Sequence, residues 1–182
     1  APKNRGAADP GAGGRVVGQA AAMHGGGRCG GVAIIARVGR VDGARGLDGE
    51  PGFPDPEARA MSATCGGLRV WTLYVPNGRS LDNEHYPYKL RWLEALRVSL
   101  LAAKATSPPL VLCGDFNIAP TDDDVWDPAQ FVDSTHVSVP ERKALAALVG
   151  IGLDDVQPRA FKGRAFTYWD YRGGNFHKGM GM

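Results

Sequence analysis

Residues 110–117 read LVLCGDFN, an apolar run that leads into a carboxylate and an amide two residues apart. The apolar residues 110–113 predict a buried strand. Asp115 and Asn117 then lie at its carboxyl end, where α/β folds bind their ligands. Because alternate residues of an extended chain face the same side, we expect these two side chains to project together and Phe116 to point into the packing.

A carboxylate beside a neutral amide suits the hydrolysis of a phosphodiester. The Asp115 carboxylate can accept a proton from water or help to hold a divalent ion. The Asn117 amide can orient that carboxylate and donate to a phosphoryl oxygen. The alternative interpretation is a strand-end turn capped by Asp and Asn, which is a common arrangement. The segment alone leaves both interpretations open.

A second strand is predicted over residues 68–75, LRVWTLYV, from its β-branched and aromatic residues. Tyr74 stands near the end of this strand, and Asn77 and Arg79 follow in a Pro-Asn-Gly turn. All three side chains can donate hydrogen bonds to a phosphate. The alternative is a buried aromatic residue followed by a surface turn.

The remaining elements indicate an α/β chain. Leucines three and four residues apart predict a helix over 84–104, and a leading proline with Gly150 after its end predicts another over 140–149. Residues 32–38 predict a buried strand, and Pro and Gly predict a loop over 39–60. Residues 1–31 are rich in Ala and Gly, and we expect them to be poorly ordered, ahead of a domain over 32–182. This order of elements predicts a layered α/β sandwich.

Composition excludes several classes of protein. The chain of 182 residues has no apolar run near the roughly 18 that a membrane helix needs, so no membrane partner is expected. Its three cysteines form no Cys-x-x-Cys pair, which argues against a disulfide framework or zinc ribbon and favours a cytoplasmic location. The glycines of residues 25–30 fit G-x-G-x-x-G, but they follow low-complexity sequence and precede a strand-like segment rather than a helix, so we reject a dinucleotide site. The four histidines lack ligand spacing and are expected at the surface.

Five segments, taken in order, resemble the exodeoxyribonuclease III family, the abasic-site endonucleases of the endonuclease/exonuclease/phosphatase superfamily. They are YVPNGRS (74–80), HYPYKLRWLEAL (85–96), PLVLCGDFNIAPTDDDVWDP (109–128), VPERKALAALVGIGLDDV (139–156) and FTYWDYRGGNFHKGMGM (166–182). The resemblance implies a four-layered α/β sandwich, here incomplete. It also implies Mg²⁺-dependent hydrolysis, with Mn²⁺ as the alternative metal, at abasic sites and 3′ ends of double-stranded DNA. We expect a monomer.

The resemblance also implies roles for individual residues. Tyr74 would contact the scissile phosphate, Asp115 would align or deprotonate the attacking water, and Asn117 would orient Asp115 and stabilise developing charge. Asp115 and Asn117 are also the predicted metal-binding residues. Contacts to DNA are predicted for Asn77, Arg79, Tyr168, Trp169, Arg172 and Lys178.

The sequence departs from the family pattern near both ends. If Lys3 matches the lysine of the family's Q-E-T-K motif, the metal-binding Glu falls on Ala1. The family's R-I-D and S-D-H motifs do not follow Met182. We therefore expect an internal fragment of such an enzyme, with low activity. The alternatives are a non-catalytic nucleic-acid-binding remnant or a phosphatase of another branch, although aromatic and basic residues after position 165 favour DNA.

Overall fold

Strands β6 (Leu68–Tyr74) and β7 (Leu110–Asp115) lie side by side and parallel, which confirms the two strands predicted from their apolar runs. Their register pairs Tyr74 with Asp115, so both strands end at the same edge of the sheet. Gly114 permits this pairing. It has φ +132°, and a Cβ there would lie 2.0 Å from the carbonyl oxygen of Leu73, so only glycine fits.

The computed structural model describes residues 15–16, 19–25, 30–38, 40–47, 57–106, 108–156 and 166–182. The chain divides into two compact units. The first unit comprises Ala1–Val75 and Val98–Phe116, and the second comprises Pro76–Arg97 and Asn117–Met182.

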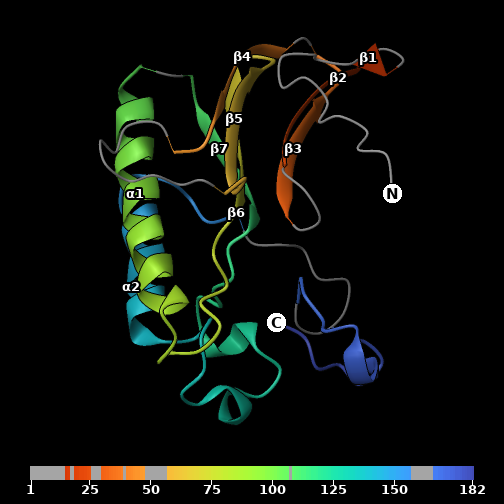
Figure 1. The fold of residues 1–182 in the computed structure, drawn as a ribbon, viewed down its shortest axis with the longest axis vertical. Coiled ribbons are helices and arrows are strands. Elements are labelled where there is room, and N and C mark those ends of the chain that lie inside the picture. Colours follow the sequence, from red (N-terminus) through yellow and green to blue (C-terminus); the bar gives the residue numbers. More distant parts are fainter. Residues whose placement is uncertain are drawn as a thin grey trace, which may run out of the picture. The chain divides into compact units, whose positions relative to one another are not determined.

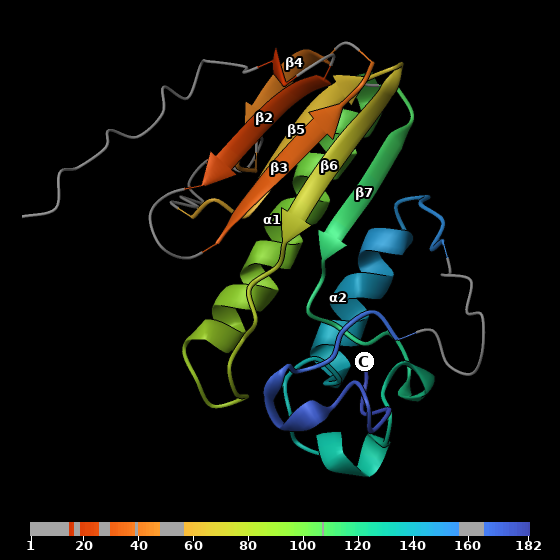
Figure 2. The same ribbon diagram turned by 90° about the vertical axis from the view of Figure 1, so that its right-hand side faces the viewer.

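The first unit contains two sheets. The order β4-β5-β6-β7 describes a four-stranded mixed sheet, in which β4 (Arg40–Arg45) and β5 (Ala60–Cys65) are antiparallel neighbours. A two-residue turn joins β5 to β6, and its residues Gly66 and Gly67 both have positive φ, as a tight hairpin requires. The other sheet is antiparallel and contains β1 (Arg15–Val16), β2 (Gln19–Gly25) and β3 (Gly31–Ala36). Figure 2 shows the strand directions.

The core of the first unit lies between its two sheets, which face one another in Figure 1. One face of β3 supplies Val32 and Ile34 to this core, whereas Ile35 on the other face is 67% exposed. The predicted buried strand is therefore buried on one side only. The cluster is completed from β2 and β5 by small or flexible side chains, namely Ala22, Met61, Ala63 and Cys65.

Helix α1 (His85–Thr106) confirms the helix predicted over 84–104 and passes from the second unit into the first. Leu93, Leu96 and Leu100 of the predicted apolar stripe are fully buried, whereas Leu101 is 42% exposed. In Figure 1 the later part of α1 covers the face of the four-stranded sheet opposite β3. The predicted α/β class is therefore confirmed. The described part of the chain contains no helix long and apolar enough to cross a membrane.

The second unit contains little regular structure beyond helices. Helix α2 (Val139–Val149) confirms the helix predicted over 140–149 and begins at a capping box, in which the Ser138 side chain and Glu141 bond each other's backbone. Short 3₁₀ helices occupy η1 (Asp122–Asp124), η2 (Pro128–Phe131) and η3 (Arg172–Gly174). Backbone hydrogen bonds join Tyr168 to Met182, and Trp126 to Gly181.

Two strands lie in N-terminal segments for which we expected none. Residues 19–25, within the segment 1–31 that we expected to be poorly ordered, form β2 and pair with β3 over six residues. The predicted loop over 39–60 contains β4. Both strands are poor in β-branched residues, so tertiary pairing rather than local propensity determines them. The Pro-rich residues 48–56, and residues 26–29 of the glycine motif at 25–30, lie outside the described residues.

Candidate active site

Tyr74 lies at the carboxyl end of β6, against the sheet-to-sheet core. Arg59 contacts it twice, since its guanidinium carbon lies 5.0 Å from the centre of the tyrosine ring and its Nη1 donates to the Tyr74 carbonyl over 3.3 Å. The Tyr74 amide in turn donates to the carbonyl of Arg59 over 2.7 Å. Arg59 therefore fixes the tyrosine and brings a positive charge to it, a role that the sequence analysis missed.

Asp115 is the last residue of β7, and its side chain is exposed. Its carbonyl accepts from the amide of Val75 over 2.9 Å, which continues the pairing of the two strands by one step. The chain is not extended as far as Asn117, in contrast to our expectation. The strand ends at Asp115, and Asn117 has φ +51°, a left-handed conformation to which strand alternation does not apply.

Asn77 and Asn117 meet through their side chains in the second unit. The Nδ2 atom of Asn77 donates to Oδ1 of Asn117 over 3.3 Å and lies 3.4 Å from Nε2 of His136. The Oδ1 atom of Asn77 accepts from the amide of Arg79 over 3.1 Å. With Oδ1 of Asn117 accepting, its Nδ2 is the donor end of the amide, which suits a phosphoryl oxygen.

His136 joins this pair from the segment before α2. Its Nδ1 lies 2.6 Å from the carbonyl oxygen of Asn117. Since a carbonyl can only accept, Nδ1 carries the proton and Nε2 is the acceptor that faces Asn77. His136 also has φ +80°, which is uncommon for a residue other than glycine. We expected a surface histidine here rather than a metal ligand, and the ring is half-buried and hydrogen-bonded.

A buried ion pair lies beneath the two asparagines. Lys89 of α1 and Glu141 of α2 are both fully buried, and Nζ of Lys89 lies 2.5 Å from Oε1 of Glu141. Burial alone would raise the pKa of the Glu141 carboxyl. Hydrogen bonds from Lys89, Ser138, His136 and Thr135 outweigh that effect and hold the pKa below its ordinary value of 4.5.

Aromatic and basic side chains gather in the described C-terminal segment, residues 166–182. Trp169 is half-buried and makes edge-to-face contacts with Phe166 and Phe176, at centroid distances of 6.3 and 5.1 Å. Tyr168 is 54% exposed. The Arg172 guanidinium lies 5.5 Å from the centre of the Tyr171 ring, and Lys178 is exposed. The predicted DNA-contacting residues of this segment are therefore accessible, apart from the partly covered Trp169.

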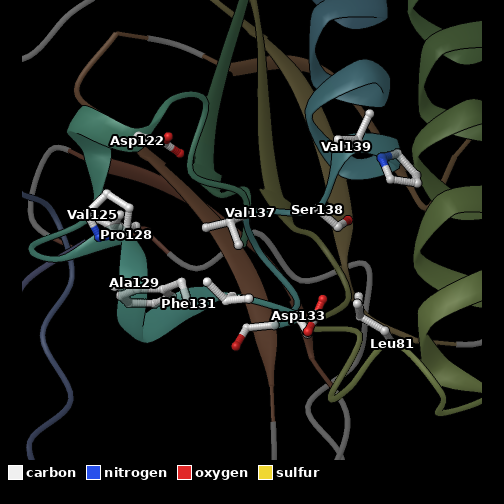
Figure 3. A pocket seen from close by; sticks show the side chains of 13 residues that line it. Leu81, Asp122, Val125, Pro128, Ala129, Phe131, Asp133, Val137, Ser138 and Val139 are labelled. Carbon is white, nitrogen blue, oxygen red and sulfur yellow. The ribbon is translucent and has the colours of Figure 1, made fainter.

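A pocket of about 600 Å³ lies elsewhere in the second unit, among η1, η2 and the segment before α2. Figure 3 shows side chains such as Val125, Phe131 and Val137 around it, with Asp122 and Asp133 at its sides. The lining of this described pocket includes none of the predicted site residues. The residues with the predicted chemistry therefore stand at strand ends and loops rather than around this pocket.

The predicted metal ligands do not form a closed cation site. Within the described ranges, no group of three or more His, Cys, Asp or Glu side chains is arranged to hold a metal. Asp115 supplies one exposed carboxylate, whereas Oδ1 of Asn117 accepts from Asn77. One carboxylate still suits Mg²⁺, which usually keeps several waters and binds substrate phosphates.

Sequence reasoning missed Lys89, Glu141 and Thr135, although two of them left a signal. Lys89 lies four residues before Leu93 and seven before Leu96, so it is an ionisable residue on the apolar stripe of its helix. Glu141 completes the Ser-x-x-Glu pattern of a capping box with Ser138. Thr135 left no comparable pattern.

Comparisons with known proteins agree on the relationship. A model of the "Endonuclease/Exonuclease/phosphatase family" matches residues 4–182. The solved "3'-5' exonuclease (NExo)" from Neisseria meningitidis is 36% identical, with a TM-score of 0.83 over 91% of this chain and 64% of that one. An AP endonuclease from Archaeoglobus fulgidus is 32% identical, with a TM-score of 0.78 over the same shares.

A curated relative, "Exodeoxyribonuclease" of Bacillus subtilis, is 29% identical over 129 residues. The match covers 70% of this chain and 50% of the relative. The chain thus spans about half the length of this curated relative and 64% of the two solved ones.

Proposed function

The chain belongs to the endonuclease/exonuclease/phosphatase family, and on this premise we propose that it acts in DNA repair as a phosphodiesterase. The family assignment confirms the resemblance that the ordered motifs indicate, together with the α/β sandwich fold. The proposed substrates are abasic sites and 3′ ends of double-stranded DNA. Support comes from the relatives, whose names describe an exodeoxyribonuclease, a 3′-5′ exonuclease and an AP endonuclease.

The observation that carries the proposal is the pairing of Tyr74 with Asp115 at the carboxyl ends of two parallel strands. Adjacent parallel strands bring their end residues to one edge of the sheet, the edge at which α/β folds bind ligands. At this edge the exposed carboxylate of Asp115 is paired with Tyr74, and the positively charged guanidinium of Arg59 lies over the tyrosine ring. A base next to a hydrogen-bond donor and a cation suits attack by water on a phosphate ester.

We assign the reaction roles accordingly. Asp115 accepts the proton of the attacking water. Asn117 donates through Nδ2 to a phosphoryl oxygen, and Tyr74 donates to a phosphate oxygen. A magnesium ion bound at Asp115 would neutralise charge on the phosphate oxygens. Asn77, Arg79 and the residues of the C-terminal segment would contact the DNA backbone and bases.

A non-catalytic DNA-binding protein is the second candidate. The exposed Tyr168, with Arg172 and Lys178 nearby in sequence, favours it, because stacking and positive charge bind DNA without any reaction. The two candidates differ in the part played by Asp115, which only the enzyme needs.

The experiment pairs single-turnover cleavage with binding, on one abasic duplex and one duplex with a recessed 3′ end, in Mg²⁺. Asp115→Asn should abolish cleavage, because an amide cannot accept the proton of water. Affinity should hold or rise, because a negative charge facing the DNA polyanion is removed. Tyr168→Ala is the matched control, and it should weaken binding by about 1–3 kcal/mol if the ring stacks on a base.

Three outcomes decide between the candidates. Loss of cleavage with binding retained supports the proposal. Equal loss of both in Asp115→Asn would make this residue structural and contradict it. Binding without cleavage by the unaltered chain would favour the second candidate.

A further inference from the structure

We propose that the buried Lys89–Glu141 ion pair is a positioning device for the phosphate-facing asparagines. It holds the backbone carbonyls of Asn77 and Asn117 and thereby aims their side-chain amides. The inference rests on the proposed function, because it assigns these buried residues to the same site. All the contacts that carry it lie within the second unit.

The Nζ atom of Lys89 bonds acceptors on three residues of the second unit. It donates to the carbonyl oxygen of Asn117 over 2.6 Å, to that of Asn77 over 3.3 Å, and to Oε1 of Glu141 over 2.5 Å. A compact ammonium matches this arrangement, whereas a planar guanidinium directs its donors differently. Two of these bonds go to the asparagine backbones, in addition to the one that joins the ionic partner.

Glu141 fixes the other side of the arrangement. Besides Lys89, its Oε1 accepts from the hydroxyl of Thr135 over 2.7 Å and from the backbone amide of His136 over 3.0 Å. Its Oε2 accepts from the backbone amide and the hydroxyl of Ser138, over 3.2 and 2.5 Å. The carboxylate thus orders the whole segment 135–138 at the start of α2.

Each asparagine carbonyl receives a second bond from this ordered segment. Thr135 Oγ1 lies 3.0 Å from the Asn77 carbonyl oxygen and shares its single hydrogen between this carbonyl and Oε1 of Glu141, whereas His136 Nδ1 donates to the carbonyl of Asn117. Gly78 makes the approach possible, because a Cβ on it would lie 2.7 Å from Thr135 Oγ1. Both carbonyls are therefore held between Lys89 and a residue that Glu141 itself fixes.

This arrangement has a consequence for the side chains. Asn117 has φ +51°, a conformation that surrounding contacts must maintain. Because both backbone carbonyls are held, Nδ2 of Asn77 can donate to Oδ1 of Asn117. This bond fixes the orientation of the Asn117 side-chain amide and therefore the direction in which its Nδ2 can donate. A buried ion pair is weak evidence for stability, since well-packed apolar residues often serve as well. The bonds from Lys89 to the backbones of Asn77 and Asn117 are better explained if the ion pair positions these two residues.

The test compares Lys89→Met with Leu148→Ala, a variant of a buried α2 residue outside these bonds. Both variants are studied under conditions in which circular dichroism shows that they are folded. The first readout is the NMR signal of each asparagine side-chain amide, with Asn83 and Asn175 as internal references. Lys89→Met should shift Asn77 and Asn117 but not the references, and Leu148→Ala should shift none of them.

The second readout is single-turnover cleavage. Lys89→Met should lower the rate about 100-fold at nearly unchanged DNA affinity, as misplaced reacting groups do, while Leu148→Ala should change neither. Lys89→Arg should not restore the rate. If Lys89→Met does not fold, Thr135→Val removes one bond to the Asn77 carbonyl, and its Asn77 signal alone should shift.

Equal shifts of the asparagine signals in Lys89→Met and Leu148→Ala would overturn the inference and make the pair purely structural. So would unshifted asparagines in folded Lys89→Met or, where that variant does not fold, in Thr135→Val. A wild-type chain that does not cleave DNA refutes the proposed function, and the amide signals then decide the positioning role by themselves.

Discussion

The two units of the protein are organised by different interactions. In the first unit, Val32, Ile34 and Met61 fill the space between two sheets, and the described buried residues of this cluster have apolar side chains. In the second unit, a lysine and a glutamate are fully buried, and their hydrogen bonds order the loops around them. The first unit is thus stabilised chiefly by the burial of apolar surface. The second unit is stabilised also by the hydrogen-bond network around the buried lysine and glutamate.

This difference determines how each unit responds to a change. An apolar core loses free energy roughly in proportion to the volume removed, and it partly relaxes. A buried polar network fails when one member is lost, because its partner remains as an uncompensated charge. The strand ends of the first unit supply Tyr74 and Asp115, whereas the network of the second supplies Asn77 and Asn117.

The largest expected effect comes from breaking the network on one side. Lys89→Met should lower the free energy of unfolding by about 3–5 kcal/mol, because Glu141 then stays buried without its cation. The double variant Lys89→Met/Glu141→Leu should recover a good part of this loss, since neither charge remains. Urea titration followed by circular dichroism measures both.

A matched control is the Asp122–Arg142 pair of the same unit, in which Asp122 is 70% exposed and the charges are 2.9 Å apart. Its double-mutant cycle should give a coupling of only about 0.2–1 kcal/mol, because water screens it. A Lys89→Met loss as small as this coupling would contradict the contrast between the two units.

The apolar core should give a somewhat smaller loss. Met61→Ala removes a side chain that is 2% exposed between the two sheets, and it should cost about 2–4 kcal/mol by lost transfer and cavity formation. Met61→Leu conserves volume and should cost less than about 1.5 kcal/mol. The same urea titration applies. If Met61→Leu were as harmful as Met61→Ala, the core would depend on specific contacts rather than on filled volume.

The sequence predicts the apolar parts of this protein better than the polar ones. The segments that form β6, β7 and α1 can be recognised from the spacing and type of their apolar residues, because an element that buries one face needs apolar residues at regular intervals. Asp115 and Asn117 can be recognised as candidate site residues because they follow the apolar run of a predicted strand, and α/β folds bind their ligands at the carboxyl ends of strands. Their roles as site residues stay predictions.

Strands β2 and β4 could not be predicted, because small and polar residues such as Ala20–Ala22 of β2 become strands only when a neighbour pairs with them. The strand-alternation argument fails at Asn117, since a residue with φ +51° cannot be deduced from a strand pattern. The contact between Lys89 and Glu141 joins residues 52 positions apart. Each residue alone left a local signal, but only the fold reveals that they are partners.

The smallest expected effect is a change in acid sensitivity, and it isolates the charge of Glu141. Burial tends to raise the pKa of this carboxyl, but hydrogen bonds from Lys89, Ser138, His136 and Thr135 hold it below the ordinary value of 4.5. The folded protein therefore binds this proton more weakly than the unfolded chain does. The resulting stabilisation is complete above about pH 4.5 and is lost as the pH falls through the lower folded-state pKa.

Comparison of two proteins separates Glu141 from the other carboxyl groups. Lys89→Met/Glu141→Leu keeps every other acid, including Glu94, whose pKa the adjacent Arg97 lowers. The free energy of unfolding of the wild type should fall more steeply below about pH 4.5 than that of the double variant, and the two slopes should agree near neutrality. Urea titrations at several pH values measure this difference. Parallel curves down to strongly acidic pH would mean that the network gives Glu141 no preference for its charged form, and the contrast between the units would then rest on packing alone.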